Sequence, residues 1–201
     1  CSYAIALSYG VAEDRKRIGE HLIRKTRAIG YTVGTGFFGT GILNQMLTEQ
    51  GAVEDAWKMM LQTAFPSWLY PVTQGATTIW EHWDGMKDDG SMWSADMNSF
   101  NHYAYGAIGE WMYRAMAGIE ADPEHPGFKH AILYPRIGGN LKYTAGKYHS
   151  IYGDVGVKWE VQGKQITLTV QIPVNTTAEI RLDKAKAVLE SDGQVGGQAG
   201  L

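Results

Sequence analysis

The apolar residues of this 201-residue chain change their spacing near residue 120, and this change limits the possible folds more than any other feature. Up to about Glu120 they recur every three or four residues, which is the spacing of one helix face. Beyond about Pro123 they alternate with polar residues, as in half-buried strands. We therefore expect an α+β chain, with several helices followed by a small antiparallel β domain.

Four helical stretches stand out in the first part. They are centred on residues 18–29, 42–47, 53–64 and 100–116. The last stretch is the most regular, and Asn98 or Ser99 precedes it as a candidate N-cap. This pattern predicts one long helix up to about Met116, with His102 in its first turn.

The clearest strand signal in the second part is a hairpin. Residues 155–161 and 166–172 alternate between apolar and polar types, and a Gln162-Gly163-Lys164 turn separates them. Residues around 141–145 and 178–182 indicate further strands, so a β-sandwich is expected. The cluster of breakers at 122–127 predicts a linker between two domains, 1–122 and 127–201.

Composition excludes several classes of function. The formal charge of −3 provides no basic excess for binding nucleic acid. No apolar run approaches the ~20 residues of a membrane span. The histidines show no ligand spacing, so neither metal nor cofactor is expected.

Residues 34–41 form a Gly-rich loop without a P-loop lysine, which argues against a nucleotide site. Two interpretations of this loop are left: a tight turn, or a loop that lines a cleft. Compartment stays open among secreted, periplasmic and cytoplasmic.

The most suggestive segment for chemistry is Gly75–Gly85. It places Glu81 between the indoles of Trp80 and Trp83, and Asp84 follows three residues after Glu81. Indole faces can stack on the C–H face of a pyranose, and a pair of carboxylates can move protons. The alternative is that both indoles belong to the core and Glu81 is a salt-bridged surface residue. Residue types alone favour this alternative.

The exact residue order in three segments is more informative about function than the residue types alone. Gly36–Thr40, Thr77–Gly85 and Met97–Ala107 resemble, in order and spacing, motifs of the bacterial α-L-rhamnosidases of glycoside hydrolase family 78. The stretch from Gly127 to Ala178 resembles the C-terminal β-sandwich of that family. The resemblance therefore extends over nearly the whole chain.

This resemblance implies a partial (α/α)₆ toroid of the six-hairpin glycosidase type, followed by an antiparallel β-sandwich. It implies inverting hydrolysis of terminal α-L-rhamnose from a glycoside or polysaccharide. Glu81 then corresponds to the general base and His102 to a residue that binds the sugar. Trp80 and Trp83 would shape the pocket because of their positions beside Glu81.

One departure from the family pattern affects these expectations. The family's general acid lies in an upstream acidic segment that this chain lacks, so the isolated chain is expected to be inactive. The residues that follow Cys1 look like the end of a helix, so we expect the chain to be part of a longer protein. Helices without their toroid neighbours would expose apolar stripes, which predicts self-association. Three alternatives stay open: a toroid glycosidase for a different sugar, a non-catalytic carbohydrate-binding module, and a structural fragment without a ligand.

Overall fold

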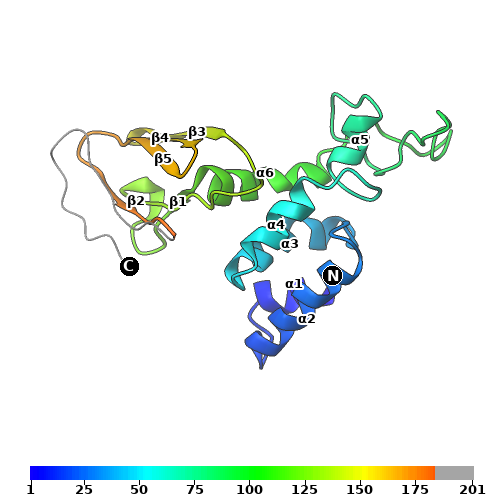
Figure 1. Cartoon of the computed structure of the whole chain (residues 1–201), viewed down its shortest axis with the longest axis horizontal. Coiled ribbons are helices and arrows are strands. Elements are labelled where there is room, and N and C mark those ends of the chain that lie inside the picture. Colours follow the sequence, from blue (N-terminus) through cyan, green and yellow to red (C-terminus); the bar gives the residue numbers. More distant parts are fainter. Residues whose placement is uncertain (184–201) are drawn as a thin grey trace. The chain divides into compact units, whose positions relative to one another are not determined.

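The computed structural model describes residues 1–183 and divides them into two compact units (Figure 1). The first unit is Cys1–Trp111 and the second begins at Met112. Helices make up the first unit and two small sheets dominate the second, which confirms the α+β organisation. No helix among residues 1–183 has the length and apolar character needed to cross a lipid bilayer.

Five α-helices precede the candidate site in the first unit. Their bounds are Ser2–Ser8 (α1), Arg15–Ala28 (α2), Phe37–Glu49 (α3), Val53–Met60 (α4) and Leu69–Thr73 (α5). Helix α2 begins after Asp14, whose carboxylate accepts a hydrogen bond from the Arg17 amide at 2.9 Å. Gly30, at φ +69°, follows its C-terminus and supplies the left-handed conformation that ends many helices.

Helix α3 is the centre of the first unit, because α1, α2 and α4 all contact it. Its Thr48 hydroxyl accepts a hydrogen bond from the Trp111 indole at 2.9 Å. The Trp57 ring from α4 packs edge-on against the same indole, with ring centroids 5.2 Å apart. Both indoles are 1% exposed. They tie the C-terminal end of α3 to the end of the unit.

The long helix predicted over residues 100–116 is wrong in its start and in its regularity. A 3₁₀ helix, η1 (Ala104–Ala107), leads into the short α6 (Ile108–Trp111), and a π-helix, η2 (Met112–Ala117), follows. Ser99 does not cap a helix. Its hydroxyl accepts a hydrogen bond from the Asn101 amide at 3.2 Å, and its carbonyl accepts one from the Glu81 amide at 2.9 Å. These bonds hold the backbone before Ala104 in a loop, so His102 lies outside the helix.

The second unit contains two three-stranded sheets. The strands are Ile119–Ala121 (β1), His130–Leu133 (β2), Tyr143–Ser150 (β3), Gly153–Gln162 (β4), Gln165–Gln171 (β5) and Thr177–Ile180 (β6). One sheet has the order β3-β4-β5 and is antiparallel, and the predicted hairpin is its β4-β5 pair. The other sheet, in the order β1-β2-β6, is mixed, because β2 and β6 run parallel. The short 3₁₀ helix η3 (Pro126–Phe128) lies between β1 and β2.

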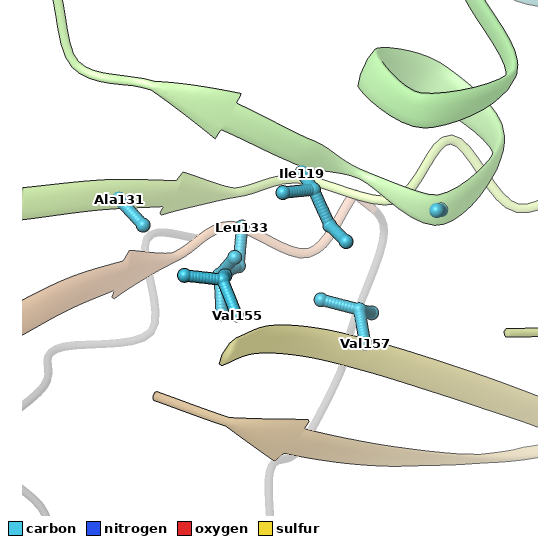
Figure 2. Packing of buried hydrophobic residues seen from close by; sticks show 6 residues of the cluster. Ile119, Ala131, Leu133, Val155 and Val157 are labelled. Atoms are coloured by element: carbon cyan, nitrogen blue, oxygen red, sulfur yellow. The ribbon is translucent and has the colours of Figure 1, made fainter. Parts of the chain in front are cut away.

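A hydrophobic core lies between the two sheets of the second unit. Figure 2 shows Ile119 and Leu133 of one sheet facing Val155 and Val157 of the other. All four are at most 4% exposed. Gly118 stands where η2 passes into β1, at φ +77°, and a Cβ there would lie 2.1 Å from the backbone nitrogen of Pro135. The start of this sheet therefore requires a glycine.

Candidate functional site

Two irregular segments of the first unit carry the predicted site residues, and backbone hydrogen bonds hold these segments together. The Glu81 amide donates to the Ser99 carbonyl at 2.9 Å, and the His102 amide donates to the Ile79 carbonyl at 2.8 Å. The Thr78 hydroxyl adds a bond to the Phe100 carbonyl. Glu81 and His102 are thus carried by neighbouring stretches of backbone, although they are far apart in the sequence.

The Glu81 carboxylate is close to few polar groups. Its side chain is 22% exposed, and Oε2 accepts a hydrogen bond from the Ser99 amide at 3.1 Å. The other oxygen, Oε1, lies 3.9 Å from Nε2 of His82. The carboxylate is therefore oriented by a backbone amide while part of it still reaches solvent.

The His82 ring is fixed by an aromatic neighbour. It stacks on the Trp93 indole with ring centroids 3.7 Å apart and an interplanar angle of 13°. Its Nε2 is buried, and nothing among the described residues makes a hydrogen bond to it. Oδ1 of Asn98 is buried and unpartnered in the same part of the structure, while Nδ2 of that residue donates to the Gly85 carbonyl at 2.8 Å. These two atoms can bind water or a polar ligand.

Trp80 and Trp83, on either side of Glu81 in the sequence, are both buried. Trp80 is 6% exposed and meets Phe100 edge-on, with centroids 5.0 Å apart. Trp83 is 9% exposed and stacks on Tyr105 with centroids 3.7 Å apart. Burial raises the pKa of the Tyr105 phenol. The two indoles thus support the loop from within the unit.

The His102 ring makes two aromatic contacts. Its ring is stacked with Phe37 at 5.1 Å and with Tyr103 at 5.6 Å between centroids. Its Nδ1 accepts a hydrogen bond from the Ala104 amide at 3.3 Å, which leaves Nε2 as the ring nitrogen for a ligand. Phe37 also contacts Tyr105, so a chain of rings joins His102 to the packing under Glu81.

A network of side chains holds the loop that carries Trp93. The Asp88 carboxylate accepts hydrogen bonds from the Tyr70 hydroxyl and the Gln74 amide, each at 2.9 Å. Burial, together with this bond, raises the pKa of Tyr70. Asp89 accepts bonds from both the hydroxyl and the amide of Ser91, and these bonds lower the pKa of Asp89. The loop is thus held both by side chains at α5 and by its own Asp89–Ser91 bonds.

Sequence reasoning missed three residues of this arrangement. Phe37 begins α3 and lies within the Gly-rich segment 34–41, for which a loop lining a cleft is one of the two sequence interpretations. Ser99 is noted in the sequence only as a candidate helix cap, and it reaches Glu81 through its backbone amide, which no residue type signals. Trp93 lies in a stretch without apolar periodicity, so only its residue type could draw attention to it. Among residues 1–183 no three His, Cys, Asp or Glu side chains are grouped as ligands for a metal ion.

Comparison with known proteins covers nearly the whole chain. Residues 1–116 match the bacterial alpha-L-rhamnosidase 6 hairpin glycosidase domain, and residues 118–197 match the bacterial alpha-L-rhamnosidase C-terminal domain. An alpha-L-rhamnosidase of Streptomyces avermitilis is 39% identical over 181 residues, which are 89% of this chain and 17% of that protein. One from Formosa agariphila is 37% identical over 183 residues, which are 90% of this chain and 20% of that protein.

Solved structures give the same result. The Streptomyces avermitilis alpha-L-rhamnosidase complexed with L-rhamnose superposes with a TM-score of 0.84 at 35% identity, over 95% of this chain and 19% of that one. The Aspergillus terreus enzyme also gives 0.84, at 34% identity, over 90% of this chain and 21% of that one. The chain therefore spans about one fifth of the length of these relatives.

Proposed function

The chain belongs to the bacterial α-L-rhamnosidase family, and from this membership we propose that its Glu81 site takes part in the inverting hydrolysis of terminal α-L-rhamnose. The observation that carries the proposal is the environment of the Glu81 carboxylate. It is held by the Ser99 amide, partly open to solvent, and lies on a segment hydrogen-bonded to that of His102. A relative in this family was solved with L-rhamnose bound.

We assign Glu81 the role of general base. In inversion, a carboxylate removes a proton from water while the water oxygen bonds to the anomeric carbon. The glycosidic C–O bond breaks on the opposite face, and a second carboxyl group protonates the leaving oxygen. The Ser99 amide bond orients Glu81 for this step. The buried polar atoms of His82 and Asn98 add sites where water or a sugar hydroxyl can bind.

His102 is the proposed sugar-binding residue, and it acts through Nε2. Its ring is stacked with Phe37 and with Tyr103, so less rotamer freedom is lost when a sugar hydroxyl binds. Trp80 and Trp83 are proposed to shape the sugar pocket indirectly, because their ring contacts fix the loop that carries Glu81.

The proposal is tested by the substitution Glu81→Gln in a full-length α-L-rhamnosidase that contains this sequence. Glutamine keeps the shape of the side chain but cannot accept the proton. We expect turnover of an aryl α-L-rhamnoside to fall by about 10²–10⁴-fold. Affinity for L-rhamnose, measured by calorimetry, should change little. Glu54→Gln, an exposed change on α4, is the matched control and should keep normal turnover.

Unchanged turnover in Glu81→Gln would remove Glu81 from the mechanism. A non-catalytic carbohydrate-binding protein would instead show binding but no turnover in the unaltered full-length form. Screening that form against aryl glycosides of other sugars separates rhamnose from a different substrate.

We further propose that the 201-residue chain alone does not hydrolyse rhamnosides. An inverting pair needs two carboxyls about 6.5–9.5 Å apart, and the proposed acid belongs to a segment outside this chain. An aryl α-L-rhamnoside assay should show no release above buffer. A rate matching the full-length enzyme would contradict the assignment of the acid.

A further inference from the structure

A cavity in the second unit has no part in the proposed hydrolysis. Its volume is about 460 Å³, within the range of small-molecule pockets. The lining residues are Asp122, His125, Lys129, His130, Asn175 and Thr177. They come from one end of the β1-β2-β6 sheet. Asp122 follows β1, while His130 and Thr177 are the first residues of the parallel strands β2 and β6.

Hydrogen bonds between the lining residues orient their polar groups. Nδ1 of His130 lies 2.7 Å from the Thr177 hydroxyl, and Nδ1 of His125 lies 2.7 Å from the Asp122 carboxylate. The Lys129 ammonium donates to the Asn175 carbonyl at 2.6 Å. In each imidazole Nε2 is therefore the nitrogen left for a ligand. The ammonium has two further N–H groups. Donors and acceptors together suit hydroxyl groups, which both donate and accept.

Charge in the cavity is balanced. Lys129 supplies one positive charge and Asp122 one negative charge, and the hydrogen bond from His125 lowers the pKa of Asp122. Glu179 of β6 and Arg181, directly after that strand, pair with each other at 2.6 Å and so add no net charge. This balance favours a neutral polyhydroxylated ligand over an anion or a cation.

Aromatic surface adjoins the polar lining. The Lys129 ammonium lies 5.2 Å from the ring centre of Tyr152, which is 42% exposed. Phe128, next to Lys129, has φ +67° and packs on Tyr148 with ring centroids 4.4 Å apart. Positive φ is unusual for a bulky residue, and such conformations cluster at ligand sites. An exposed ring beside hydroxyl-binding groups is suited to the apolar face of a sugar.

We propose that this cavity is a second carbohydrate site, which binds one ring of a neutral sugar through His130, Lys129 and Thr177. Only the choice of L-rhamnose as the first probe rests on the proposed function. The lining chemistry is independent of Glu81. The site would hold a glycan through contacts that make no contribution to bond cleavage.

The test is a titration of the ¹⁵N-labelled 201-residue chain with L-rhamnose, D-galactose or D-glucuronate, followed by amide chemical shifts. A neutral sugar should produce saturable shifts at His130, Lys129 and Thr177. The substitution Thr177→Val removes the hydroxyl that orients His130 and should weaken binding about 2- to 10-fold. Thr169→Val, the same change at an exposed position of β5, is the matched control.

A second variant distinguishes a loss of binding from a loss of the fold. Lys129 is exposed, so Lys129→Ala should keep the folded spectrum while it weakens binding. The proposal is overturned if no neutral sugar shifts these amides up to about 100 mM, or if only glucuronate does. It is also overturned if neither variant weakens binding. Shifts confined to the Glu81 and His102 segments would support the proposed function and reject the second site. Shifts confined to the cavity would support the second site, and the proposed function is tested separately by Glu81→Gln in the full-length protein.

Discussion

His102, the proposed sugar-binding residue, is held in place by its neighbours. Phe37 and Tyr103 both stack with its ring, and the Ala104 amide donates a hydrogen bond to Nδ1. In the full-length enzyme, His102→Ala should raise KM about 2- to 10-fold with a smaller change in kcat, because one hydrogen bond to the sugar is lost in ground and transition states alike. Steady-state kinetics on an aryl α-L-rhamnoside measures both constants.

Tyr103→Phe is the control for His102→Ala, since it keeps the stacked ring and removes an exposed hydroxyl. It should leave both constants unchanged. A loss of kcat without a change in KM for His102→Ala would show that the imidazole acts in the chemical step and not in binding.

Part of the candidate site could be predicted from residues close together in the sequence. The indoles beside Glu81 mark an unusual segment, but the part that each indole plays depends on the side chains that it contacts. Trp83 is covered by Tyr105, and His102 is stacked on Phe37. These ring contacts join separate segments of the chain, so no local spacing encodes them.

At the scale of elements, alternation predicted the β4-β5 hairpin correctly, because a strand with one buried face needs that pattern. The helix start at Ser99 was wrong for a physical reason. The carbonyls of Ser99 and Phe100 are bonded to the Glu81 amide and the Thr78 hydroxyl, so the backbone there follows a neighbouring segment. The parallel pairing of β2 with β6 joins strands far apart in the sequence, which a single-strand pattern does not encode.

The β3-β4 hairpin carries a carboxylate whose contribution depends on pH. Asp154 lies 3.0 Å from the Lys147 ammonium and 2.5 Å from Nδ1 of His149, and hydrogen bonds from these two groups lower its pKa. A lowered folded pKa means stability that is present above the unfolded pKa and lost as pH falls through the folded one. Asp154→Asn should therefore lower the melting temperature at pH 7, with the difference from wild type disappearing in acid.

Thermal melts from pH 7 to about pH 3 measure this difference. Glu160→Gln is the control, because Glu160 pairs with Lys158 of the same strand and does not cross the hairpin. Added salt should reduce the Asp154 effect, since the pair is solvent-exposed. A difference that is constant across the pH range would assign the effect to packing.

At the scale of the whole molecule, the chain is about one fifth of the length of its relatives, and its helical unit exposes apolar side chains. Tyr9 is 76% exposed and Val11 72% exposed. Burying such a side chain fully contributes about 1.5–3 kcal/mol, so two molecules gain by covering these surfaces. Sedimentation velocity should show self-association of the 201-residue chain that increases with concentration.

The double substitution Tyr9→Ser and Val11→Ser should weaken this association at least about tenfold, because both side chains lose most of their apolar area. Val174→Ser is the control. Val174 is 85% exposed but lies in the second unit, so its replacement should leave the association unchanged. A chain that stays monomeric at every concentration would contradict the prediction, because exposure of these side chains would then not drive association. An effect of Val174→Ser equal to that of the double substitution would move the contact to the second unit.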